Sequence, residues 1–182
     1  MAKLYLIRHG KASGVWGMEK DPGLDDLGHT QAKTVALTLA PLGPLPIITS
    51  PLARTRETSE PLAKIWQTKA RVEPRVGEIR FPSETPADRV RWLKEVMIDQ
   101  WPNLDRHLRQ WRQEVLEALV SVDTDTVVFT HYIAINVAVG YATEDSRVVC
   151  FSPDNASITV METRGNSLFL IDRGVEADTE VR

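Results

Sequence analysis

Short apolar runs alternate with longer segments of helical periodicity along most of the chain. Short runs with apolar, β-branched or aromatic residues predict strands at 3–7, 47–49, 71–73 and 126–130, of which the first two are expected to be buried. Apolar positions at helical spacing predict helices at 27–42, 51–66, 86–98, 105–122 and 133–141. Because strands and helices alternate, we expect a three-layer α/β/α sandwich with a mostly parallel central sheet and helices on both faces.

The last part of the chain departs from this alternation. Two strands are predicted at 156–161 and 167–171, joined by a turn at 164–166, and we expect them at the edge of the sheet, where they can run antiparallel. The acidic tail from Gly174 to Arg182 is expected to fray. Earlier in the chain, Ser50 and Pro51 are expected to start a helix as its N-cap and first residue.

The chain length of 182 residues indicates a single domain, 1–182, because it suffices for one buried core and is too short for two ordinary ones. A stretch at about 74–104, rich in Trp, Arg and Pro, lies between predicted core elements. We expect it to form a cap or lid over the functional site.

The charge balance excludes some classes of partner. There are 22 basic and 25 acidic residues, so the net charge is −3 and no global basic field exists to hold nucleic acid or an anionic membrane. Cys150 is the only cysteine, which excludes a disulfide framework and a Cys-rich zinc site. The apolar run near the N-terminus is too short for a signal peptide or membrane span, so a cytoplasmic location is expected. No heptad pattern indicates an oligomeric state.

Polar residues follow three of the predicted strands. Arg8 and His9 end the first strand, Arg54 follows the second by a few residues, and His131 ends the strand at 126–130. Ligands of open α/β sheets bind outside the carboxyl ends of the parallel strands. We therefore expect these two histidines and two arginines to converge on one crevice.

Such a set of side chains suits phosphoryl transfer. Guanidinium groups match phosphoryl oxygens, and helix N-termini near 51 and 132 would add amide donors. A neutral imidazole can attack phosphorus, and a second, charged imidazole can stabilise the transition state. The sequence contains no Asp-rich metal cluster, no GxxxxGK loop and no His-Glu-x-x-His, so we expect neither a metal nor an organic cofactor.

Several segments resemble the motifs of the histidine phosphatase superfamily, which includes the cofactor-dependent phosphoglycerate mutases. The signature is Leu6-Ile7-Arg8-His9-Gly10, and the second motif is Thr49-Ser50-Pro51-Leu52-Ala53-Arg54-Thr55-Arg56-Glu57-Thr58. The later motifs are Gly77-Glu78 and Thr130-His131, with weaker similarities at 27–32 and 155–158. The motifs follow the order of the family and span residues 4–160.

The resemblance implies a role for each of these residues. His9 would be the nucleophile, and Arg8, Arg54 and His131 would hold the phosphoryl oxygens. Glu78 would protonate the leaving oxygen and then help to activate water, which requires burial to raise its pKa. Glu84 is a rival for this acid. Arg56 lies two positions from Arg54, so both cannot face the site, and the family register selects Arg54.

One residue departs from the family pattern. Many members have glycine after the second histidine, whereas this chain has Tyr132, which could narrow or cover the pocket. The acid phosphatase branch has aspartate there, so Tyr132 argues against that branch. We interpret Tyr132 and Arg80 as candidate substrate-binding residues.

The function predicted from these residues is hydrolysis of small phosphomonoesters through a phosphohistidine on His9, without a metal. Three alternatives stay open: mutase-type phosphoryl transfer, hydrolysis of protein phosphohistidine, and a non-catalytic module that binds a phosphorylated ligand. Phosphoglycerate mutases are generally longer, and the smallest phosphohistidine phosphatases lack an elaborated middle segment, so the small-molecule phosphatase is favoured.

Overall fold

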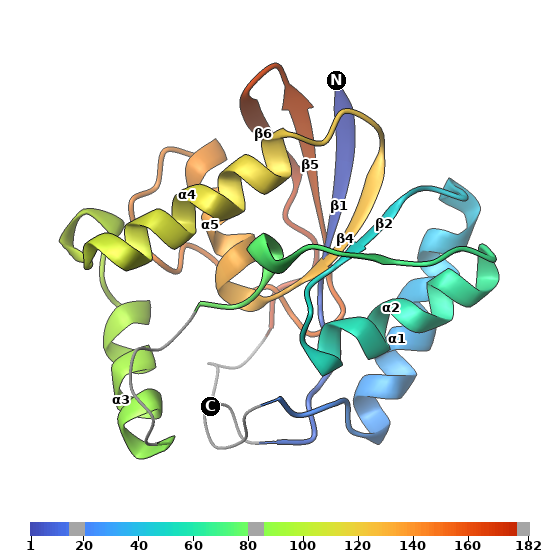
Figure 1. Cartoon of the computed structure of the whole chain (residues 1–182), viewed down its shortest axis with the longest axis horizontal. Coiled ribbons are helices and arrows are strands. Elements are labelled where there is room, and N and C mark those ends of the chain that lie inside the picture. The colour runs from blue at the N-terminus through green and yellow to red at the C-terminus, as the bar shows by residue number, and fades with distance from the viewer. Residues whose placement is uncertain (15–20, 80–85, 178–182) are drawn as a thin grey trace.

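A computed structural model describes residues 1–14, 21–79 and 86–177 (Figure 1). Its strands are β1 Ala2–Arg8, β2 Ile47–Thr49, β3 Arg71–Val72, β4 Thr126–Thr130, β5 Ile158–Arg164 and β6 Ser167–Asp172. Its α-helices are α1 Asp26–Leu39, α2 Ala53–Ile65, α3 Pro86–Met97, α4 Arg106–Val120 and α5 Tyr132–Ala142. Short 3-10 helices are η1 Ala40–Leu42, η2 Pro74–Val76 and η3 Trp101–Asn103.

The strands form one sheet with the order β3-β2-β4-β1-β5-β6. The pairs β3–β2, β2–β4 and β4–β1 are parallel, whereas β5 pairs antiparallel with both β1 and β6. The predicted α/β fold with a mostly parallel sheet is therefore confirmed. One detail was wrong: of the two late strands only β6 is at an edge of the sheet, because β5 lies inside it next to β1. Arg8 is level with Thr130 in the β1–β4 register, so these two strands end together.

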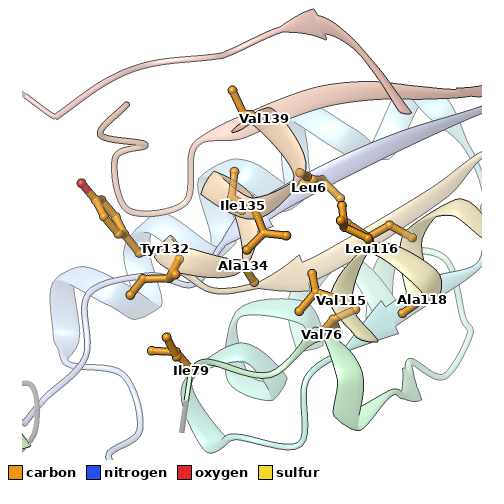
Figure 2. Close-up of a cluster of buried hydrophobic side chains, with 14 of the residues drawn as sticks. Leu6, Val76, Ile79, Val115, Leu116, Ala118, Tyr132, Ala134, Ile135 and Val139 are labelled. Atoms are coloured by element: carbon orange, nitrogen blue, oxygen red, sulfur yellow. The ribbon is translucent and has the colours of Figure 1, made fainter. Parts of the chain in front are cut away.

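Two apolar cores cover the two faces of the sheet. On one face, Ile7 and Phe129 pack in a cluster with residues of α1 and α2. On the other, Leu6 and Val128 join residues of α4 and α5. Alternate residues of one strand point to opposite faces, which is why Leu6 and Ile7 belong to different clusters. Figure 2 shows part of the second cluster, in which Ile79 lies beneath the start of α5.

The start of α2 differs from the prediction. The helix begins at Ala53, its N-cap is Leu52, and the cap makes no side-chain hydrogen bond. Ser50 and Pro51 instead belong to a turn between β2 and α2, in which the amide of Leu52 donates to Ser50 Oγ at 3.2 Å. The predicted N-cap role of Ser50 is therefore wrong, and its hydroxyl is available to another partner.

The tail also differs from the prediction up to residue 177. The amide of Ala177 donates to the carbonyl of Ser152 at 2.8 Å, and the amide of Asp154 donates to the carbonyl of Val175 at 3.1 Å. These bonds form a short antiparallel pairing around Pro153 and Glu176. The backbone of 175–177 is thus tied down rather than frayed, while 178–182 lie outside the described residues.

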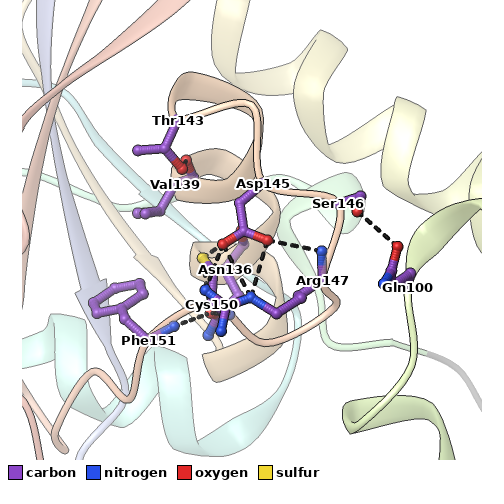
Figure 3. A network of polar contacts seen from close by, with 9 residues as sticks. All are labelled: Gln100, Asn136, Val139, Thr143, Asp145, Ser146, Arg147, Cys150 and Phe151. Carbon is purple, nitrogen blue, oxygen red and sulfur yellow. Dashed lines mark hydrogen bonds and ion pairs between the residues drawn. The ribbon is translucent and has the colours of Figure 1, made fainter.

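A polar network holds the connection between α5 and the 152–154 segment (Figure 3). Oδ1 of Asn136, on α5, accepts from the amides of Cys150 at 2.8 Å and Phe151 at 3.1 Å. Asp145 and Arg147 pair within the same connection at 2.6 Å. The network matters for function because the 152–154 segment contacts Arg8, as described below. In the described part of the chain, no helix combines the length and apolar character needed to cross a bilayer.

Candidate active site

His9 follows β1 directly, and its ring is buried. Its amide donates to the carbonyl of Thr130 at 3.1 Å, and its Nδ1 lies 2.8 Å from the carbonyl oxygen of Gly10. A carbonyl oxygen can only accept, so Nδ1 carries the ring hydrogen and Nε2 keeps its lone pair. Nε2 accepts from Nε of Arg54 at 3.2 Å. The backbone thus determines which nitrogen of His9 can act as a nucleophile.

The loop after His9 is fixed by close packing against α1 and α2. A Cβ on Gly10 would lie 2.7 Å from the carbonyl oxygen of Gly28 at the start of α1, so only glycine fits this approach. The amide of Gly10 donates to Thr58 Oγ1 at 3.0 Å, and Nδ2 of Asn155 donates to the carbonyl of His9 at 3.0 Å. Contacts from three separate segments therefore hold the nucleophile in place.

Arg54 lies in the first turn of α2, with its side chain buried against His9. Arg56, two residues later, is exposed. Nearby, Glu57 Oε2 accepts from the amide of Leu24 at 2.6 Å, which holds the loop before α1. The second motif thus places one arginine at the site and uses its glutamate for structure.

His131 is the residue between β4 and α5, and its side chain is fully buried. Its ring packs edge-on against His9, with centroids 5.2 Å apart and planes inclined by 61°. Nε2 lies 2.7 Å from Ser50 Oγ, whereas Nδ1 has no hydrogen-bond partner among the described residues. The ends of β1, β2 and β4 therefore meet at the two histidines, as expected from the parallel sheet.

Arg8 is held beside the histidines by the 152–154 segment. Its NH1 donates to the carbonyl of Pro153 at 2.9 Å, and its guanidinium carbon lies 5.0 Å from the ring centroid of Tyr132. The Tyr132 hydroxyl is 3.1 Å from Ser152 Oγ. Tyr132 thus stacks against a candidate phosphate ligand, and a substrate contact of its own stays a prediction.

Glu78 is buried near both arginines. Burial raises the pKa of its carboxyl to about 7, while main-chain hydrogen bonds and the charges of Arg54 and Arg8 oppose this shift. Oε1 accepts from the amide of Ile79 at 3.0 Å, and Oε2 has no partner among the described residues. Both protonation states of Glu78 are therefore populated near neutral pH. The rival acid Glu84 and the candidate ligand Arg80 lie outside the described residues.

The two histidines are neutral at neutral pH. Burial lowers the pKa of His9 well below its ordinary value, and the charges of Arg54 and Arg8 add to this effect. Burial also lowers the pKa of His131 well below its ordinary value, followed by the effects of His9 and the two arginines. Neutral His9 retains the lone pair that an attack requires. The same causes favour the neutral form of His131, and a charged imidazole at this position stays a prediction.

Sequence reasoning did not assign three side chains that shape the site. Ser50 bonds His131, Thr58 bonds the Gly10 amide, and Asn155 bonds the His9 carbonyl. The signal was present, because Ser50 and Thr58 belong to the second motif and Asn155 to the similarity at 155–158. Only the folded structure shows what they contact.

The fold and the site define an α/β protein with two buried histidines and two arginines at the carboxyl ends of its parallel strands. A model of the histidine phosphatase superfamily, branch 1, matches residues 4–174. The chain therefore belongs to this superfamily.

Similar proteins include both mutases and phosphatases. A probable phosphoglycerate mutase of Photorhabdus laumondii is 32% identical over 122 residues, which cover 64% of this chain and 51% of that protein. The match thus spans about half of the length of this curated relative. A phosphoserine phosphatase of Entamoeba histolytica, solved with 3-phosphoglyceric acid, has a TM-score of 0.73 at 20% identity and covers 96% of this chain and 98% of its own. A mycobacterial glucosyl-3-phosphoglycerate phosphatase has a TM-score of 0.71 at 21% identity, covering 97% and 100%. At this identity, the structural likeness establishes the shared fold.

Proposed function

We propose that the protein hydrolyses small phosphomonoesters in two steps, through a phosphohistidine on Nε2 of His9. The observation that carries this proposal is the state of the His9 ring. Nδ1 is tied to the carbonyl of Gly10, so the lone pair is on Nε2, where it accepts from Nε of Arg54 until a phosphoryl group replaces that contact. The ring is neutral because its pKa is lowered, so it can act as a nucleophile at neutral pH.

In the first step, Nε2 of His9 forms a bond to phosphorus while the bond from phosphorus to the ester oxygen breaks. The leaving oxygen takes a proton from Glu78. A pKa of about 7 keeps a substantial fraction of this carboxyl protonated at neutral pH, as a general acid requires. The product of the step is an alcohol, together with phosphohistidine and an ionised Glu78.

In the second step, water attacks the phosphohistidine. Ionised Glu78 takes a proton from the water as the oxygen–phosphorus bond forms, and the bond from phosphorus to Nε2 of His9 breaks. Inorganic phosphate leaves, and both residues return to their initial states. One carboxyl with a pKa near 7 thus serves as acid and then as base.

The positive charge for both steps comes from side chains of the site. Arg54 is buried and Arg8 is partly buried next to the two histidines, where charge interactions are stronger than in water. A phosphoryl dianion bound between them would accept a hydrogen bond from the His131 ring. No part of this scheme requires a metal ion.

We propose that the 74–104 segment contributes to substrate choice. Its described part includes α3, which stands beside the layers around the sheet (Figure 1), and η3, whose Trp101 is buried against Trp111. The structural neighbours are named for phosphoserine and glucosyl-3-phosphoglycerate, which are phosphate esters of small carboxylates. Esters of this kind are therefore the first candidates, with Arg80 and Tyr132 as candidate contacts.

The test is a panel of phosphomonoesters, supplied with a chelator, in which phosphate release and labelling of the protein are followed. We expect release of phosphate and an acid-labile, base-stable adduct that is absent from His9→Ala. Full turnover by His9→Ala would overturn the proposal. Binding of phosphorylated ligands with neither turnover nor adduct would indicate the non-catalytic module.

A mutase is the second candidate, because the curated relatives are named probable phosphoglycerate mutases. It would use the same phosphohistidine but return the phosphoryl group to a second hydroxyl of the substrate. Incubation with 3-phosphoglycerate separates the two activities. Hydrolysis faster than isomerisation supports the phosphatase, and the reverse supports the mutase. Phosphorylated histidine peptides belong in the same panel, to test hydrolysis of protein phosphohistidine.

A further inference from the structure

The two nitrogens of the His131 ring have different surroundings. Nε2 lies 2.7 Å from Ser50 Oγ, and Nδ1 is buried with no hydrogen-bond partner among the described residues. A neutral imidazole carries one hydrogen, so one nitrogen donates and the other accepts. The position of that hydrogen determines what His131 can offer to a phosphoryl oxygen, which is a pure acceptor when ionised.

The hydrogen bonds of Ser50 indicate where the hydrogen lies. The amide of Leu52 donates to Ser50 Oγ at 3.2 Å, so one lone pair of this oxygen is used. The hydroxyl hydrogen of Ser50 then needs an acceptor. Within the described residues, the acceptor in hydrogen-bond contact with Ser50 Oγ is Nε2 of His131. A hydroxyl that donates to Nε2 leaves the ring hydrogen on Nδ1.

The backbone holds Ser50 in the position that this arrangement needs. Its amide donates to the carbonyl of Phe129 on β4 at 3.1 Å, and its carbonyl accepts from Thr55 Oγ1 at 3.1 Å. Ser50 and His131 are both fully buried, so water does not compete for the hydroxyl. The backbone of Ser50 is therefore held by β4 on one side and by α2 on the other, which fixes the position of its hydroxyl.

We propose that Ser50 is a positioning residue that holds His131 in the tautomer with hydrogen on Nδ1, so that Nδ1 donates to a phosphoryl oxygen of the substrate. The proposal rests on the proposed function. In the opposite tautomer, a lone pair on Nδ1 would face the phosphoryl oxygens and repel them. The substrate would then lose one donor at the point where negative charge develops.

The direct test is ¹⁵N NMR of the histidine rings in the whole protein. The chain has four histidines, so single substitutions assign every ring. In the wild type at neutral pH, we expect His131 to show a protonated Nδ1 and an unprotonated Nε2. In Ser50→Ala, we expect the two tautomers to mix. A wild-type ring with hydrogen on Nε2, or an unchanged tautomer in Ser50→Ala, would overturn the proposal.

Turnover supplies the second readout. Loss of a hydrogen bond to a buried group predicts a fall of about 10- to 100-fold in the hydrolysis rate of Ser50→Ala. The matched control is Thr126→Val, which removes a buried hydroxyl at the start of β4 and leaves the contacts of Ser50 in place. We expect Thr126→Val to keep the wild-type tautomer. A mixed tautomer in this control would assign the effect to the loss of any buried hydroxyl and contradict a specific role of the Ser50 hydroxyl.

The two proposals can fail separately. If the wild type neither hydrolyses phosphomonoesters nor forms an adduct, the proposed function is wrong, and the NMR spectrum still decides the state of His131. If the wild type is active while Ser50→Ala has the same rate and the same tautomer, the function stands and the role of Ser50 is wrong.

Discussion

The two histidines of the site are buried at the ends of adjacent parallel strands, yet different groups control their rings. The hydrogen of His9 is held by the carbonyl of Gly10, a backbone acceptor that no substitution removes. The ring of His131 is held by the hydroxyl of Ser50, a side chain. The nucleophile thus depends on the course of the backbone, whereas its partner depends on one replaceable oxygen atom.

This difference has a chemical reason. A nucleophile needs a free lone pair on Nε2, and a backbone carbonyl at Nδ1 secures it. A residue that holds phosphoryl oxygens needs a hydrogen directed at them, which His131 has in the proposed tautomer. An imidazole ring therefore acts as an acceptor at the end of β1, in His9, and as a donor at the end of β4, in His131.

The largest effect is expected from His9→Ala, which removes the acceptor ring altogether. We expect turnover to fall by about 10⁴-fold or more, because the covalent path is lost. Phosphate release measures the effect. His29→Ala is the control, since His29 is exposed in the first turn of α1 and should leave the rate unchanged. Similar losses in both variants would contradict the assignment.

Arg54→Ala should rank next, because it removes the cation that bonds Nε2 of His9. Loss of one charge-stabilising arginine from a phosphoryl-transfer site costs on the order of 10³-fold or more in rate. The exposed Arg56 offers the matched control on the same helix. Steady-state rates of both alanine variants test this, and a steeper loss in Arg56→Ala would show that the second motif was read in the wrong register.

Glu78→Gln should lower the rate by about 10²- to 10⁴-fold, the usual contribution of an acid–base group. The wild-type rate should fall above pH 7, where the acid with a pKa of about 7 ionises. The variant should lack this dependence. A pH–rate profile checks both points, and an unchanged alkaline limb in the variant would assign the acid elsewhere, with Glu84 as the first candidate.

The same substitution should make the protein more stable at high pH. Folding raises the pKa of Glu78 from 4.5 to about 7. The contribution of this carboxyl to stability is therefore fully present below pH 4.5 and is lost as the pH rises through 7. Glutamine does not ionise. We expect Glu78→Gln and the wild type to be similar at pH 4 and to differ by roughly 3 kcal/mol in favour of the variant at pH 8. Urea unfolding at the two pH values measures this difference, and equal stabilities at pH 8 would contradict the raised pKa.

The smallest effect is expected from Tyr132→Phe, which keeps the ring against Arg8 and removes the hydroxyl that bonds Ser152. We expect a loss of about 1 kcal/mol in stability and a rate within about threefold of the wild type. Thermal unfolding and turnover measure the two quantities. A large loss of turnover with little change in stability would instead show that the hydroxyl contacts the substrate.

Much of the fold could be predicted because the strands have strong local signals. The β-branched run at Thr126–Thr130 and the apolar run before Arg8 became β4 and β1 with boundaries close to those expected. The place of β5 in the sheet was harder to predict, because pairing of β5 with β1 joins residues more than 150 positions apart. The tail was misjudged for the same reason, since its composition is polar and its partner Ser152 is provided by the fold.

The site shows the same limit at the level of side chains. Family motifs pointed to His9, Arg54 and His131, and the parallel sheet explains why they meet. Ser50 was interpreted as a helix cap, because a serine before a proline is typical of a helix start. Its bond to His131 depends on the relative position of β2 and β4, and no local pattern encodes that position.

The central claim is that Nε2 of His9 carries the phosphoryl group during turnover. Rapid acid-free quenching with a labelled phosphomonoester, followed by mass spectrometry of the peptides, tests it most directly. We expect one phosphorylated residue, His9, in the peptide that contains residues 4–10, with the adduct accumulating in Glu78→Gln if hydrolysis of the intermediate becomes limiting. A phosphoryl group found on another residue, or turnover with no adduct at His9 under any condition, would contradict it.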